Sequence, residues 1–260
     1  VARTGRSFQV MTGGLKVRGT AWGEGPRVVL LHGWEGRGSQ LHAFVQPLVG
    51  AGFSVLALDA PGHGRSEGRT SGPLDFAQAL EALAREAGPF HAVVAHSLGS
   101  VATAFALEEG LRVSRIVLIS PPATPSRFYT GLLGMLGFPE REFQPALDAF
   151  AARIGFAWER VDLKTLATRM RIPMLLIHDR GDRETPFEEG AAVAQAWPGA
   201  ELMSTEGLGH RRILKDEAVV AKAVAFLRMG APTEIPAGPL QDFGPRSLEQ
   251  HLFLRELRLA

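Results

Sequence analysis

The sequence has no cysteine among its 260 residues. This absence excludes disulfides, thiolate nucleophiles and metal sites with cysteine ligands. The sequence also lacks any apolar run near the ~20 residues that a membrane span requires. Residues 1–7 contain no apolar stretch of the kind found in a signal peptide. We therefore expect a cytoplasmic protein without a membrane partner.

Neither sign of charge is in excess. Lysine and arginine number 28, aspartate and glutamate number 27, and the formal net charge is +1. This balance gives no electrostatic reason to expect nucleic acid as a partner. The apolar fraction of 45% is that of an ordinary globular protein, and the length suits one large domain or a domain with an insertion. The sequence carries no signal for an oligomeric state.

Strand-like and helix-like segments alternate along most of the chain. Continuous apolar runs, typical of buried parallel strands, occupy residues 27–31, 53–58, 90–95, 115–119 and 172–177. Helical patterns lie between or after them, at residues 41–48, 74–87, 101–107, 188–197 and 216–229. A hairpin pattern at 8–22 precedes them, and a short last strand is expected at 201–205. This order predicts an α/β fold, with a mostly parallel sheet and helices on both faces.

The segment at 121–168 interrupts this alternation. It is too long for an ordinary connection between two strands. Apolar residues recur in it at helical spacing, at Phe143, Leu147, Phe150 and Ile154. We interpret the segment as a small helical lid. Part of this apolar stripe is expected to face the sheet, because so short a segment cannot bury a core alone.

A second irregular segment follows Met229. Residues 231–239 are rich in proline and read as a linker, and residues 247–250 have the pattern of a capping box that opens a short helix. The expected organisation is therefore a core at 1–120 and 169–230, a lid at 121–168, and a linker with a short tail helix at 231–260.

The stretch around Ser97 has the pattern of a nucleophile elbow. Ser97 stands between an apolar, β-branched run and a helix-like run, and this strand, tight turn and helix would expose a serine hydroxyl at the top of a sheet. Ala95 and Gly99 are small enough for the helix start to approach the strand closely. Taken alone, the motif also fits an ordinary strand–helix junction with a serine cap.

Four motifs in a fixed order carry a family resemblance. They are His32-Gly-Trp34, Asp59-Ala-Pro-Gly-His-Gly-Arg-Ser66, Ala95-His-Ser-Leu-Gly99, and Asp182 followed by His210. With these motifs the chain resembles the α/β-hydrolase family over about residues 8–229. The resemblance implies an eight-stranded sheet with one antiparallel strand near its start and a lid after the sixth strand. It implies neither a cofactor nor a metal.

The resemblance assigns a catalytic triad in the order that this fold uses. Ser97 corresponds to the nucleophile and His210, in a glycine-containing loop after the last strand, to the base. Two aspartates could supply the acid. Asp182 stands at the family's usual offset before a proline and is favoured, whereas Asp179 is interpreted as a strand-end residue that accepts local N–H groups. His96 adjoins the serine but is expected to point away from it.

The same resemblance implies an oxyanion hole made of the backbone N–H groups of Leu98 and Trp34. The Trp34 side chain either walls the acyl pocket or packs in the core. Aromatic residues of the lid, with Phe128 and Phe143 as the chosen candidates, are expected to contact substrate.

We therefore predict a serine hydrolase that cleaves carboxylic esters of small to medium apolar acyl groups through an acyl-enzyme on Ser97. The expected partner is a small-molecule ester. The same triad could serve hydrolysis of C–C, thioester or amide bonds, or acyl transfer, because the fold hosts many reactions. A binding protein without catalysis is the third possibility, and an apparently complete triad counts against it.

Overall fold

The computed structural model describes residues 5–154 and 158–229. The predicted linker and tail helix at 231–260 lie outside these residues.

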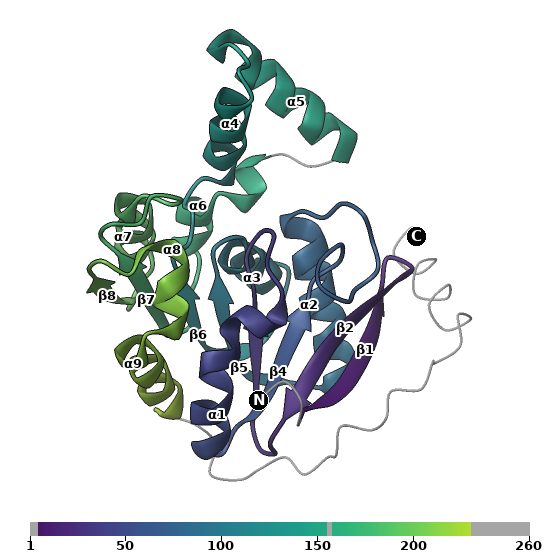
Figure 1. Ribbon diagram of the computed structural model, residues 1–260, viewed down its shortest axis with the longest axis vertical. Helices are drawn as coiled ribbons and strands as arrows, with labels where there is room; N and C mark the ends of the chain where they lie inside the picture. Colours follow the sequence, from purple (N-terminus) through teal and green to yellow (C-terminus); the bar gives the residue numbers. More distant parts are fainter. Residues whose placement is uncertain (1–4, 155–157, 230–260) are drawn as a thin grey trace.

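The core of the molecule is a single eight-stranded sheet (Figure 1). Its strands are β1 (Arg6–Thr12), β2 (Leu15–Trp22), β3 (Arg27–Leu31), β4 (Ser54–Asp59), β5 (Phe90–His96), β6 (Val113–Ile119), β7 (Met174–Asp179) and β8 (Glu201–Thr205). In space they follow the order β1-β2-β4-β3-β5-β6-β7-β8. β2 is antiparallel to both neighbours and the remaining pairs are parallel. The predicted fold class is confirmed.

Helices cover both faces of the sheet. One face is packed by α1 (His42–Gly50) and α9 (Glu217–Arg228). The other is packed by α2 (Pro73–Ala87), α3 (Leu98–Glu108), α6 (Leu163–Ala167) and α7 (Phe187–Ala196). Short helical turns, namely η1 (Gly38–Leu41), α8 (Gly209–Arg212) and η4 (Ile213–Lys215), lie close to the candidate site.

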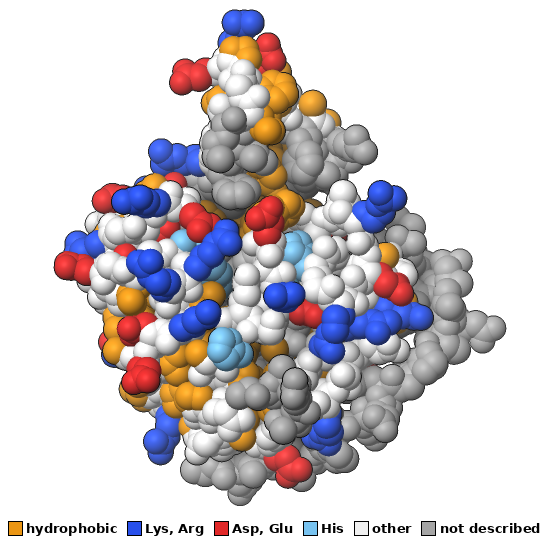
Figure 2. Space-filling model, in the orientation of Figure 1, with side chains coloured by type: hydrophobic (Ala, Val, Ile, Leu, Met, Phe, Trp, Pro, Cys, Tyr) orange, Lys and Arg blue, Asp and Glu red, His pale blue; other side chains and the backbone are white. Residues whose placement is uncertain are grey.

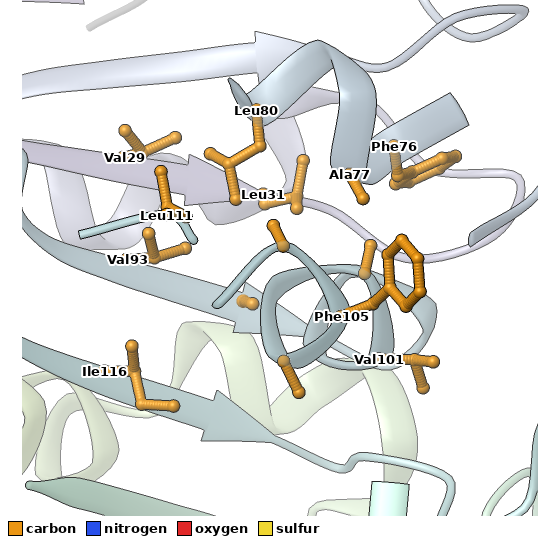
Figure 3. Packing of buried hydrophobic residues seen from close by; sticks show 14 of the residues in the cluster. Val29, Leu31, Phe76, Ala77, Leu80, Val93, Val101, Phe105, Leu111 and Ile116 are labelled. Carbon is orange, nitrogen blue, oxygen red and sulfur yellow. The ribbon is translucent and has the colours of Figure 1, made fainter. Parts of the chain in front are cut away.

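Alternation along the strands explains why both faces are apolar. In β3, Val28 and Leu30 belong to the cluster under α1 and α9, whereas Val29 and Leu31 belong to the cluster under α2 and α3. Figure 3 shows the second cluster, in which Leu80 of α2 lies over the strand residues. Each fully buried side chain of this size contributes roughly 1.5–3 kcal/mol of hydrophobic free energy. The strongly packed centre of the sheet therefore provides a rigid base for the strand ends.

A helical arm, defined here as residues 125–154, projects from this body (Figure 1). It comprises α4 (Pro125–Met135), η2 (Glu140–Glu142) and α5 (Phe143–Ile154), and η3 (Trp158–Val161) follows it. The arm is inserted after the sixth strand, where the lid was expected. α5 packs against α4, and a Cβ placed on Gly134 would lie 3.4 Å from Cζ of Phe143. Phe143 therefore faces α4, and that another part of the stripe faces the sheet stays a prediction.

The base of the arm is tied to the body. The N–H of Ala123 donates to Oε2 of Glu189 in α7 at 2.9 Å, and the N–H of Leu163 donates to the carbonyl of Ala123 at 2.7 Å. These contacts hold the chain just before α4 against the sheet domain. That the arm acts as a lid stays a prediction.

Candidate active site

Ser97 occupies a strained turn at the end of β5. Its φ of 51° and ψ of −122° are rare for a residue with a side chain and cost on the order of 1–3 kcal/mol. The turn leaves no room for a Cβ at two neighbouring glycines. A Cβ on Gly99 would lie 2.5 Å from the carbonyl oxygen of His32, and one on Gly33 would lie 2.8 Å from Cβ of Ser97. The predicted elbow is therefore built by close backbone approach at both positions.

Asp182 and His210 lie in the connections that follow β7 and β8. Asp182 lies between β7 and α7, and His210 lies in α8 after β8. Nδ1 of His210 is 2.8 Å from Oδ2 of Asp182, and both side chains are buried. Because a carboxylate only accepts hydrogen bonds, Nδ1 carries the proton and Nε2 is left with a lone pair. This is the tautomer that a general base needs.

The Asp182 carboxylate is held by several donors. Its Oδ1 accepts the N–H groups of Glu184 and Thr185, each at 2.9 Å. Burial alone would raise the pKa of this carboxyl, but hydrogen bonds from His178 and His210 outweigh burial, and the pKa lies well below its usual range. Asp182 is therefore ionised at every pH at which a histidine titrates.

Two further buried histidines surround this pair. Nε2 of His178 lies 3.4 Å from Oδ2 of Asp182 and 3.0 Å from the carbonyl oxygen of Thr185. Nε2 of His96 donates to the carbonyl of His210 at 2.9 Å, and the two rings lie 4.6 Å apart. Burial, helped by the neighbouring His210, lowers the pKa of His96 to about 3, so its ring is neutral. His96 thus contacts the backbone that carries His210, a contact that the sequence did not predict.

Asp179 has a different set of partners. Oδ2 accepts the Thr205 hydroxyl at 2.8 Å and the N–H of Leu208 at 2.9 Å, and Oδ1 accepts the N–H of Gly181 at 2.9 Å. Asp179 therefore joins the loop that carries Asp182 to the loop that carries His210. The interpretation of Asp179 as a strand-end acceptor is confirmed.

The loop after β3 lies beside the serine turn. His32 is fully buried; it donates from Nδ1 to the carbonyl of Gly33 at 2.7 Å and accepts the N–H of Ala60 on Nε2 at 3.0 Å. Asp59 accepts the N–H of Gly38 at 2.8 Å. These contacts fix the backbone around Trp34. Leu98 begins α3, so its N–H has no acceptor inside the helix and is available to an oxyanion.

A cavity of about 1130 Å³ opens over Ser97 and His210. Its lining includes Trp34, Leu98 and, from the arm, Tyr129. Trp34 is 36% exposed and lies edge-on to His63, so its side chain walls the cavity and is not part of the core. Burial raises the pKa of Tyr129 to about 12 and keeps its phenol neutral.

Phe143 and Phe128 were the other residues predicted to contact substrate. Phe143 is not among the residues that line this cavity, and its contact with substrate stays a prediction. The side chain of Phe128 lies outside the described residues. Within the described ranges, no group of three or more histidine, aspartate or glutamate side chains is placed to hold a metal ion.

The sequence reasoning missed His178, and it missed the structural use of His96. A signal for His178 was present, because it stands four residues before Asp182. At the end of a strand, such spacing lets the following turn fold back onto the side chain. His96 carried no comparable signal, since its acceptor is a backbone carbonyl 114 residues away.

The fold is that of an α/β hydrolase, and comparison with known proteins agrees. A sequence model of the Alpha/beta hydrolase family matches residues 28–223. The chain therefore belongs to this family.

Several named relatives are esterases. The pimeloyl-[acyl-carrier protein] methyl ester esterase of Vibrio campbellii is 33% identical over 222 residues, covering 70% of this chain and 86% of the relative. Its namesake from Xanthomonas campestris is 27% identical over 245 residues, covering 78% and 94%. Among solved structures, the esterase EaEST from Exiguobacterium antarcticum has a TM-score of 0.67 at 17% identity, covers 85% of this chain and 99% of its own, and shows the shared fold. The prediction of an ester hydrolase is confirmed.

Proposed function

We propose that Ser97, His210 and Asp182 form the catalytic triad of a serine hydrolase that cleaves carboxylic esters of small to medium apolar acyl groups. The observation that carries the proposal is the buried hydrogen bond between Asp182 and His210, beside a cavity that Ser97 also lines. The bond leaves Nε2 of His210 as the basic nitrogen. A serine hydroxyl is unreactive near neutral pH unless such a base removes its proton.

The proposed reaction has two halves. Oγ of Ser97 attacks the ester carbonyl while Nε2 of His210 takes its proton, and the resulting imidazolium is stabilised by Asp182. The backbone N–H groups of Trp34 and Leu98 receive the oxyanion. His210 then protonates the departing alcohol, which leaves an acyl group on Ser97. Water, deprotonated by the same nitrogen, releases the acid and restores the serine.

The relatives indicate which small-molecule esters should be tested first. The relatives from Xanthomonas campestris and Vibrio campbellii are named as esterases of the pimeloyl-[acyl-carrier protein] methyl ester. We infer that methyl and other short-alcohol esters are suitable first substrates for this chain. A cytoplasmic location stays a prediction. In the described part of the chain, no helix is long and apolar enough to cross a membrane.

The test combines labelling with turnover. A fluorophosphonate should add once, and peptide mapping should place the adduct on Ser97. A panel of p-nitrophenyl and methyl esters of graded acyl length should be hydrolysed by the wild type and not measurably by Ser97→Ala. Ser100→Ala is the matched control, because Ser100 is buried one helical turn away and donates to the carbonyl of Ala95. Labelling that persists in Ser97→Ala would refute the proposal.

A further inference from the structure

Cationic side chains gather around the cavity, although the whole chain carries a formal net charge of only +1. The charged residues in its lining comprise six cations, namely Arg37, Arg127, Arg183, Arg211, Arg212 and Lys215, and three acids, namely Glu35, Glu184 and Glu189. Figure 2 shows lysine and arginine side chains grouped on this face, below the arm. The cavity is therefore more cationic than the chain as a whole.

The acids of the lining are engaged by two of the cations. Glu184 accepts two hydrogen bonds from Arg211, at 3.0 and 3.2 Å. These bonds and the charge of Glu184 raise the pKa of Arg211, and Glu35 adds to the effect. Glu189 accepts the N–H of Ala123 and lies 3.6 Å from Arg127. The charges of Arg211 and Arg127 are thus largely balanced within the protein.

Three of the remaining cations line one part of the cavity. Arg37 directly precedes η1, Arg212 ends α8, and Lys215 ends η4. We call these three residues the basic mouth. All three are exposed, and within the described ranges none has a carboxylate partner; Arg212 donates to the carbonyl of Gly207 at 2.6 Å. η1 and η4 contact each other, and neither contains an acidic residue.

Polar neighbours complete this part of the lining. Ser39 and Gln40 of η1 also line the cavity. Guanidinium, ammonium, hydroxyl and amide groups together form a donor set for anionic oxygens, and the planar guanidinium matches two oxygens of one carboxylate or phosphate. The same cavity reaches Ser97, so one ligand can extend from the serine to the basic mouth.

We propose that the basic mouth binds an anionic oxygen group, a carboxylate or a phosphate, carried by the ester substrate at the end remote from the bond that Ser97 attacks. This inference rests on the proposed function and narrows it: the substrate is an ester with an apolar stem and a charged end. Because the three cations are exposed, each contact is weak and is screened by salt. Their combined effect falls on substrate binding and not on the chemical step.

The test uses esters matched in length. One is the methyl ester of an unbranched monocarboxylic acid, and the second is the monomethyl ester of the dicarboxylic acid of equal chain length. A third carries a phosphate on its alcohol part, which separates phosphate recognition from carboxylate recognition. The ratio of kcat/KM for an anionic ester to that for the neutral ester is measured at ionic strengths of about 0.02 and about 0.5 M.

The wild type should prefer at least one anionic ester at low salt, chiefly through KM, and lose much of that preference at high salt. Arg37→Gln combined with Lys215→Gln should lower the ratio by about three- to tenfold. Arg112→Gln is the control, because Arg112 is an exposed arginine between α3 and β6 that does not line the cavity. The control should keep the wild-type ratio.

Calorimetry measures the binding of the same esters to Ser97→Ala. This measurement distinguishes failure of this inference from failure of the proposed reaction. Preferential binding of an anionic ester that weakens in the Arg37/Lys215 variant supports the basic mouth even if no ester is turned over. Equal binding of neutral and anionic esters, or a preference that survives both substitutions, overturns it.

Discussion

Nε2 of His178 lies 3.4 Å from Oδ2 of Asp182, the same oxygen that accepts the hydrogen bond of the candidate base. His178 is fully buried at the end of β7. Since Nε2 faces a carbonyl and a carboxylate, both of which only accept hydrogen bonds, it carries a proton. His178 therefore supports the orientation and the charge of Asp182 without lining the cavity.

We expect His178→Phe to lower kcat for ester hydrolysis by about tenfold with little change in KM, because the carboxylate loses a donor that helps to fix it. The matched control is His91→Phe. His91 is also buried and its Nε2 donates to the carbonyl of Leu227, away from the site. Both substitutions should lower thermal stability, but only the first should lower kcat in the protein that remains folded. Equal kcat in the two variants would contradict a positioning role.

The choice of the triad acid yields a second prediction. Asp182→Asn should keep the fold but present an amide to His210, which favours the wrong tautomer, and kcat should fall by up to ~10⁴ as in other triads. Asp179→Asn should cost far less, since Asp179 bonds only to Thr205 and to backbone N–H groups. Circular dichroism checks folding, and ester turnover decides. A reversed order of the two losses would move the acid to Asp179.

This choice also shows how far the sequence alone could reach. Asp182 was favoured over Asp179 by its offset before a proline, and the structure places Asp182 against His210. The strands were predictable because each is a continuous apolar run, and the serine turn was predictable because Gly99 is required where the helix approaches His32. Such features depend on residues that are close in the sequence.

What the sequence did not predict depends on contacts between distant segments. Arg37 and Lys215 belong to one basic mouth only because η1 and η4 pack together. The packing of α5 is a second example. Periodicity predicted the helix, but nothing in the sequence indicated that Phe143 would face α4. Periodicity identifies an apolar face without identifying the surface that it covers.

The dependence of activity on pH yields a third prediction. Protonation of His210 removes the lone pair that accepts the serine proton, so kcat/KM should fall on the acid side. Burial lowers the pKa of His96 to about 3 and that of His32 to about 4, and the pKa of Asp182 lies below its usual range. None of these three groups changes charge between about pH 5 and 8, where histidines ordinarily titrate.

The kcat/KM for a neutral ester and the rate of fluorophosphonate labelling should therefore decline together as the pH is lowered. Agreement between the two measurements places the ionisation on the free enzyme. A labelling rate that stays level while ester turnover falls would contradict a neutral imidazole that activates Ser97 in the free enzyme.

The last prediction concerns the arm, whose residues should set the acyl range while the triad sets the chemistry. Tyr129 lines the cavity over Ser97 and packs against Trp158, with ring centroids 4.7 Å apart. Replacing Tyr129 by Ala removes most of an aromatic side chain from the cavity wall, so the preferred acyl chain in the ester panel should become longer.

Phe143→Ala tests in the same way whether Phe143 contacts the substrate. Phe138→Ala is the matched control, because Phe138 is 46% exposed on the arm and does not line the cavity. Fluorophosphonate labelling of Ser97 should persist in all three variants, since the serine turn and the loop around Trp34 lie outside the arm. If Tyr129→Ala and Phe143→Ala both kept the wild-type preference, the arm would be a structural insertion, and the acyl group would be held by the walls that Trp34 and Leu98 provide.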